Sequence, residues 1–147
     1  MYDNKLTGQI HHGMKLKNAY MLDFSRNDFY GTIPADISQE NFSTLRLLYL
    51  DHNSLTGTIP GSLMQMKKMK GLFLNDNSLE GMLPYQIDED QKVGMLTIRV
   101  QNNRLTQPIA RVFCDLDVNL GYYELVELGV DCAICPDGCK LCRGRCY

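Results

Sequence analysis

Two acidic residues and one histidine are the first candidates for chemistry in this sequence. Asp51 directly precedes His52, and Asp76 stands in a later segment of similar sequence. A carboxylate beside an imidazole can transfer a proton or hold a metal ion near neutral pH. Neither a nucleophile nor a third ligand accompanies these residues. We therefore expect no catalytic residues and no metal ion at these positions, and no cofactor.

Six cysteines form the second group of reactive side chains. Five of them are crowded into DCAICPDGCKLCRGRCY, a segment too short to bury an apolar core. Such density is typical of segments stapled by disulfides, and the even number predicts three bridges of unassigned pairing. Zinc held by two CxxC pairs is one alternative, but the pairs stand much closer together than the roughly 15–20 residues of a zinc ribbon; free thiols or a redox-active CxxC pair are the other. The cysteines are Cys114, Cys132, Cys135, Cys139, Cys142 and Cys146.

The overall composition is that of an ordinary soluble domain. The 147 residues are 44% hydrophobic and 22% charged, and the formal net charge is -2. This balance gives no electrostatic reason for binding nucleic acid or an acidic membrane surface. No run of about 18 apolar residues is present, so the sequence predicts no membrane span.

The elements that must position these side chains are marked by a recurring asparagine. Five segments of similar sequence carry it, about 23 to 26 residues apart. From the second segment onward, apolar residues stand three and five positions before the asparagine, and in all five segments one stands two positions after it. The recurring asparagines are Asn4, Asn27, Asn53, Asn77 and Asn103.

Each recurring position has a physical reason. Apolar residues two apart lie on one face of a short strand, so stacked segments would form a parallel sheet that buries this face. The asparagine amide would turn inward and satisfy backbone groups that are otherwise buried without partners. The prolines Pro34, Pro60 and Pro84 prevent a regular helix after each strand. We expect short turns or 3₁₀ segments there, at Ala35–Gln39 and Gly61–Gln65.

This frame resembles the plant-type extracellular leucine-rich repeat, LxxLxLxxNxLxGxIP, over roughly residues 1–113. The clearest copy is LRLLYLDHNSLTGTIP, residues 45–60. The resemblance implies an α/β solenoid, an arc with a parallel sheet on its concave side and short turns or 3₁₀ segments on its convex side. The extra residues Ser38–Ser43 are expected to bulge on the convex side without breaking the sheet.

The frame also predicts where the repeats end. Gln107 and Ala110 replace the glycine and the proline of the fifth copy. We therefore assign residues 1–113 to the solenoid, with about five copies, and residues 114–147 to a cysteine-rich C-terminal cap. Met1 falls inside a repeat whose strand is absent, which favours a fragment of a longer protein.

The cysteine-rich tail resembles the tails of some algal leucine-rich-repeat proteins, in which the last repeat runs into FCDL. Here that stretch is VFCDL, residues 112–116. The resemblance implies a cap formed in an oxidising compartment, and an extracellular or cell-surface protein. The sequon Asn41-Phe42-Ser43 adds a candidate glycosylation site at Asn41 on the expected convex bulge.

Residues that point outward from the concave sheet are the candidate ligand-binding set, because the fold does not dictate their types. Tyr49 and Phe73 should lie side by side on adjacent strands and form an aromatic hot spot. We expect a non-catalytic module that binds a protein, peptide or glycan in a receptor-like or secreted protein; a structural or adhesive wall protein is the alternative. The set comprises Asp23, Ser25, Arg26, Tyr49, Asp51, His52, Phe73, Asn75, Asp76, Arg99 and Gln101.

Overall fold

The computed structural model describes the chain except for residues 1–3, 85–96, 107–126, 132–133 and 135–147. Short strands follow one another in the described part, with the 3₁₀ helix η1 among them. They are β1 (Thr7–Gln9), β2 (Met21–Asp23), β3 (Asp28–Thr32), β4 (Leu47–Tyr49), β5 (Ser54–Thr58), η1 (Gly61–Gln65), β6 (Gly71–Phe73), β7 (Ser78–Gly81), β8 (Thr97–Arg99), β9 (Arg104–Leu105) and β10 (Glu127–Gly129).

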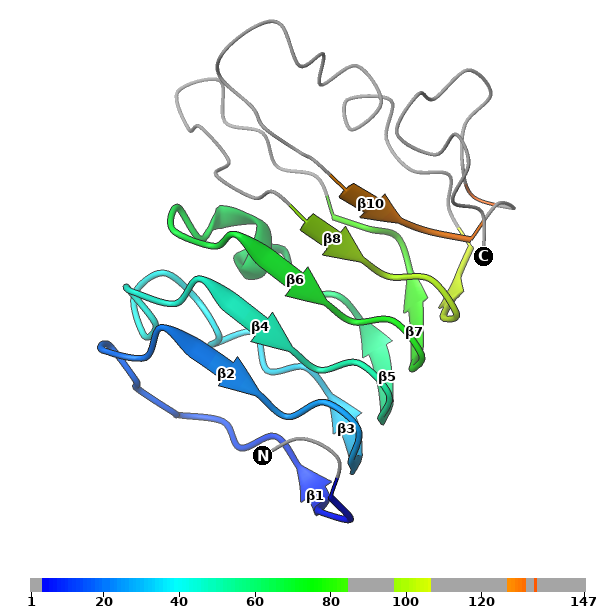
Figure 1. The fold of residues 1–147 in the computed structure, drawn as a ribbon, viewed down its shortest axis with the longest axis horizontal. Helices are drawn as coiled ribbons and strands as arrows, with labels where there is room; N and C mark the ends of the chain where they lie inside the picture. Colours follow the sequence, from blue (N-terminus) through cyan, green and yellow to red (C-terminus); the bar gives the residue numbers. More distant parts are fainter. Residues whose placement is uncertain (1–3, 85–96, 107–126, 132–133, 135–147) are drawn as a thin grey trace, which may run out of the picture.

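The strands that precede the asparagines form the expected concave sheet. Its order is β10-β8-β6-β4-β2, and every neighbouring pair is parallel and in register. Figure 1 shows these strands side by side across the front of the solenoid. The middle residue of each strand points into the core, and from β4 to β10 this column is almost fully buried: Leu48, Leu72, Ile98 and Leu128. The α/β solenoid with a parallel concave sheet is therefore confirmed as a leucine-rich-repeat arc, although it contains almost no helix.

A second parallel sheet, which the sequence analysis did not predict, follows the asparagines. Its order is β1-β3-β5-β7-β9, and Figure 1 shows it beside the concave sheet. The signal was present in segments such as Ser54–Thr58, where Leu55 is buried between two exposed neighbours. Gly57 lies in the left-handed region with φ 74°, where a side chain would be strained and would also meet the methyl group of Thr32 at 2.9 Å.

The convex side consists of short turns, as expected. Gly61–Gln65 forms the 3₁₀ helix η1, and the Ile37 N–H donates to the Pro34 carbonyl across a turn. The extra residues Ser38–Ser43 leave the sheet intact, because β2 still pairs with β4. They do more than bulge, however: Phe42 is only 1% exposed and packs in the core.

The concave sheet continues past the predicted end of the repeats. β10 lies in the part of the chain assigned to the cysteine-rich cap, yet it pairs with β8 through Leu128 and Ile98. Val130 and Ile134 are buried in the same core as the repeats. The apolar residues Leu128 and Val130 alternate with Gly129, a pattern that indicates a strand, but this segment stands outside the asparagine frame. In the tail, only residues 127–131 and 134 are described, and all six cysteines lie outside the described residues.

Candidate functional site: the concave face

A ladder of half-buried asparagines supports the concave face from within. The Asn53 Oδ1 accepts from the Phe29 N–H at 3.0 Å, and its Nδ2 lies 3.0–3.1 Å from three backbone carbonyl oxygens. Asn77 and Asn103 repeat this arrangement one and two coils further on. Each amide thus joins its own turn to the preceding coil, as the sequence analysis expected.

The residue before each ladder asparagine has a left-handed backbone. Arg26, His52, Asp76 and Asn102 have φ of 53–56°, a region in which Asn, Asp and His are enriched but other side chains are uncommon. Their N–H groups donate to carbonyls of the next coil, such as His52 to Asn75. At the last described coil the Asp131 carboxylate takes over this role and accepts from the Asn102 N–H at 2.9 Å. Sequence analysis missed this use of Asp131.

One row of outward-facing residues crosses the concave sheet from β2 to β8. The strand register places Asp23 beside Tyr49, Tyr49 beside Phe73, and Phe73 beside Arg99. The rings of Tyr49 and Phe73 are stacked, with centroids 4.4 Å apart and planes within 6°. The Arg99 guanidinium lies 5.5 Å from the Phe73 centroid, within cation–π range. We call these four residues the concave row.

Gly71 makes room for this stack on β6. A Cβ atom at this position would lie 2.7 Å from the Phe73 ring and 2.9 Å from a methyl group of Leu47. The Phe73 ring therefore leans over the bare backbone of its own strand. Tyr49 and Phe73 are both half-buried rather than fully exposed, since each ring covers the other.

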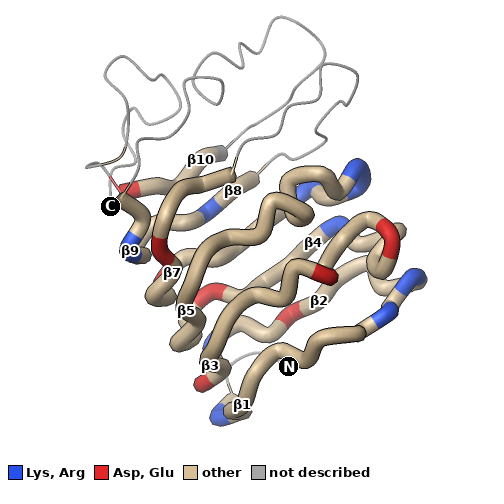
Figure 2. Tube along the Cα trace, turned by 180° about the vertical axis from the view of Figure 1, so that it is seen from behind, with Lys and Arg blue, Asp and Glu red and all other residues tan. Residues whose placement is uncertain are grey.

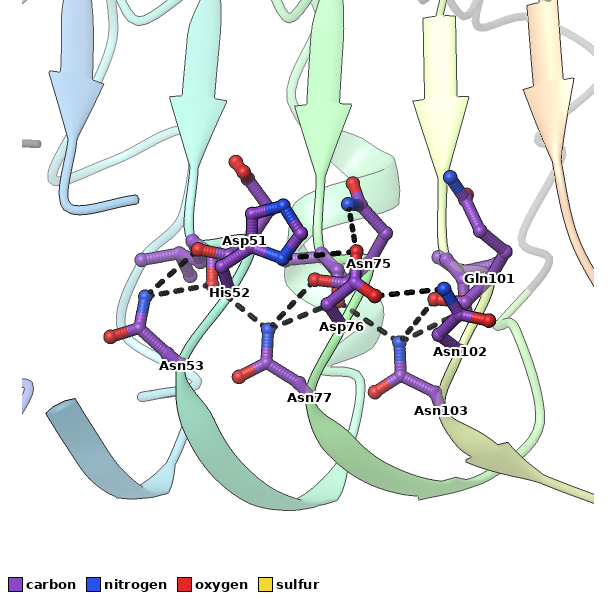
Figure 3. Close-up of polar contacts among 12 residues, drawn as sticks. Asp51, His52, Asn53, Asn75, Asp76, Asn77, Gln101, Asn102 and Asn103 are labelled. Carbon is purple, nitrogen blue, oxygen red and sulfur yellow. Dashed lines mark hydrogen bonds and ion pairs between the residues drawn. The ribbon is translucent and has the colours of Figure 1, made fainter. Parts of the chain in front are cut away.

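A belt of polar side chains lies where the strands end. The Asp76 carboxylate collects three contacts: His52 Nδ1 at 3.1 Å, Asn75 Nδ2 at 2.7 Å and Asn102 Nδ2 at 2.7 Å. Figure 3 shows these side chains above the asparagine ladder. The sequence predicted that His52, Asn75 and Asp76 share this face, and the structure brings them together around one carboxylate.

Negative charge is concentrated beside Tyr49. Burial raises the pKa of Asp51 above its ordinary value of 3.8, and Asp23 acts in the same direction, while a backbone hydrogen bond, His52 and Arg26 act against it. The Asp23 Oδ1 accepts from the Ser25 hydroxyl at 2.6 Å and from the Ser25 N–H at 3.1 Å. No cationic side chain in the described ranges forms a salt bridge with Asp23.

Two predicted concave residues are buried instead of facing solvent. Ser25 is 8% exposed, and its hydroxyl donates to Asp23. Gln101 is 9% exposed and lies over the bare backbone of Gly129, where a Cβ atom would stand 2.5 Å from its Oε1. That oxygen has no hydrogen-bond partner among the described residues. The side chains at these two positions therefore support the concave surface and expose few atoms to solvent.

Other predicted sites are only partly visible. Asn41 is half-buried, and its Nδ2, the atom to which a glycan would attach, donates to the Asp36 carbonyl at 2.9 Å. The predicted disulfides lie outside the described residues. Within the described ranges no group of three or more His, Cys, Asp or Glu side chains is placed to hold a metal ion, and no helix is long and apolar enough to cross a bilayer. Figure 2 shows basic and acidic residues spread over several strands and turns.

Comparison with known proteins agrees with the repeat frame. Residues 44–66 match the family described as Leucine Rich Repeat, while no curated protein sequence matches the chain significantly. Pollen receptor kinase 3 is 30% identical with a TM-score of 0.70, over 88% of this chain and 60% of that one. A chain of the BIR3–SERK2 complex from Arabidopsis thaliana is 28% identical with a TM-score of 0.68, over 88% and 66%.

A third solved structure contains a ligand. The Arabidopsis receptor kinase HAESA, in complex with the peptide hormone IDA and the co-receptor SERK1, is 27% identical with a TM-score of 0.52, over 89% of this chain and 25% of that one. This chain thus spans about two thirds or less of each of the three proteins. The comparisons support a binding module rather than an enzyme. Together with the repeat frame and the two parallel sheets, they show a leucine-rich-repeat fold of the plant type, similar to the folds of these plant receptor proteins.

Proposed function

We propose that this chain is the recognition part of a receptor-like or secreted protein and that it binds a protein or peptide partner on its concave face. The observation that carries this proposal is the concave row. A stacked aromatic pair, half-buried and flanked by an acidic and a basic residue, occupies positions that the repeat does not constrain. Clustered aromatic side chains of this kind dominate binding energy in protein interfaces.

The proposal includes an extracellular location, three disulfides in the tail and glycosylation at Asn41. Receptor ectodomains among the structural neighbours support the location, since the HAESA complex includes a peptide hormone and a co-receptor. The concave row also fits an extended chain, because its four side chains lie on four adjacent strands. An extended peptide of four to five residues would cover such a row, at about 4.8 Å per strand and about 3.3 Å per residue.

The test is a double substitution, Tyr49→Ala with Phe73→Ala. Proteins and peptides captured from extracellular extract by the wild-type chain supply the ligand, and its affinity for both forms is then measured by calorimetry. We expect binding to weaken at least about thirtyfold, since losing an aromatic hot spot costs about 2 kcal/mol or more. Circular dichroism should show an unchanged fold.

Gln65→Ala is the control, because Gln65 is exposed at the end of η1 on the convex side. It should bind as the wild-type chain does. If the double variant keeps full affinity while Gln65→Ala loses it, the binding surface is the convex one and the proposal is wrong.

A further inference from the structure

Only one end of the concave row has a cation stacked on its aromatic ring. Arg99 covers the face of Phe73 that points toward β8, and Tyr49 covers the opposite face. Tyr49 itself has Phe73 on its β6 side, and no ring or cation contact joins its β2 side to any described residue. The position in the row where a second cap would stand belongs to Asp23 on β2.

Asp23 leaves this position open and makes it negative. Its side chain is shorter than an aromatic one, and it bends toward Ser25, which donates twice to Oδ1. The second carboxylate oxygen, Oδ2, has no hydrogen-bond or ion-pair partner among the described residues. Asp51 lies close enough to raise the negative potential further, although Arg26 and His52 offset part of it.

We propose that the concave face binds an arginine side chain of its partner between β2 and β4, where the guanidinium stacks on the open face of Tyr49 and pairs with the Asp23 carboxylate. The inference rests on the proposed function and specifies its ligand. Arg99 over Phe73 is the same kind of interaction within this chain, and Arg46, which lies 5.4 Å from the centroid of the exposed Tyr20 ring, is a second instance. A bound arginine would complete a symmetrical row, cation–ring–ring–cation.

Arginine fits this position better than lysine for a geometric reason. A planar guanidinium can lie parallel to a ring and still direct two N–H groups toward a carboxylate at its edge. An ammonium is a compact charge that would pair with Asp23 but cover less of the ring. A neutral side chain of the same shape would stack without the charge attraction.

The experiment uses acetylated, amidated pentapeptides in which a single central residue stands between glycines. Binding to the full chain is followed by NMR through the ring protons of Tyr49, assigned by their loss in Tyr49→Leu. We expect saturable shifts with central arginine, and clearly weaker binding both with lysine and with citrulline, the neutral isostere. Asp23→Asn should weaken arginine binding about tenfold, and it keeps an oxygen that accepts from Ser25.

Glu80→Gln is the matched control, because it removes one exposed carboxylate from β7 on the other sheet. It should leave arginine binding unchanged. Equal binding of arginine and citrulline, absence of any shift with arginine, or full affinity in Asp23→Asn would each overturn the inference.

The same variants separate this inference from the proposed function. Suppose that the captured natural partner no longer binds the Tyr49 and Phe73 double variant but binds Asp23→Asn with full affinity. That result would contradict the arginine site and still support the concave interface. Full affinity of the double variant for the captured partner would contradict the concave interface itself, whatever the result with the pentapeptides.

Discussion

The asparagine ladder and the concave row cross the same coils, and each takes one residue per repeat. The ladder uses the same residue every time, and Asn53, Asn77 and Asn103 make nearly identical hydrogen bonds. The concave row uses Asp23, Tyr49, Phe73 and Arg99, four different chemistries in four repeats. Backbone groups that need partners dictate the ladder, whereas nothing in the fold dictates the row. Functional residues in this molecule are therefore sought where the repeat varies.

The largest expected effect comes from the ladder. Asn53→Ala removes the acceptor of the Phe29 N–H. It also removes one donor each from the carbonyls of Phe24, Leu50 and Asp51, which keep a second hydrogen bond. One backbone N–H left without a partner costs about 1–3 kcal/mol and each further lost hydrogen bond about 0.5–1.5 kcal/mol, so we expect a loss of at least about 2 kcal/mol in the free energy of unfolding. Urea denaturation measures it.

Asn75→Ala is the matched control for the ladder. The Asn75 side chain donates to the neighbouring Asp76 carboxylate and joins no backbone groups of two coils. It should cost much less than Asn53→Ala. Equal losses for the two variants would contradict the distinction between ladder and concave face.

An intermediate effect is expected where the backbone supports the row. In Gly71→Ala the new methyl group would collide with the Phe73 ring and with Leu47. We expect a loss of about 1 kcal/mol in stability and a downfield shift of the Tyr49 ring protons as Phe73 moves off them. Gly61→Ala on the convex side, where no atom lies within 4 Å of the new Cβ, should change neither quantity.

The smallest effect concerns the charge beside the row. Burial raises the pKa of Asp51 in the folded chain, so the folded state binds its proton more tightly than the unfolded state does. The stability that this carboxyl contributes is full below its ordinary pKa of 3.8 and is lost as the pH rises through the folded value. Asp51→Asn should therefore stabilise the chain at pH 7.

The expected gain is less than about 1 kcal/mol, since solvent screens a half-exposed group. Thermal melts at pH 7 and below pH 3.8 measure it, and the advantage of the variant should disappear in acid. Asp28→Asn, on the exposed surface of β3, serves as the control. A gain that persists unchanged in acid would mean that ionisation of Asp51 is not its source.

Much of this arrangement follows from the sequence because it is local and repeated. The asparagine spacing predicted the concave sheet, the buried column from Leu48 to Ile98 and the neighbourhood of Tyr49 and Phe73. The alternation of apolar and polar residues around Leu55 also indicated the second sheet. A five-residue pattern interrupted by Gly57 is weak evidence, however, when the neighbouring coils are not known. The burial of Phe42 could not be read from its segment, because an apolar residue in an insertion can point either way.

By itself the sequence determined the repeat and the inward face of each strand, and it predicted a set of candidate residues for recognition. These depend on the two-residue period of a strand and on the period of one coil. Only the tertiary structure decided how that set divides. Ser25 and Gln101 turned out to be buried, Asp76 gathers His52, Asn75 and Asn102, and β10 extends the sheet beyond the asparagine frame. The physical reason is that side chains on adjacent strands lie about 4.8 Å apart, so partners separated by a whole repeat in sequence settle each position.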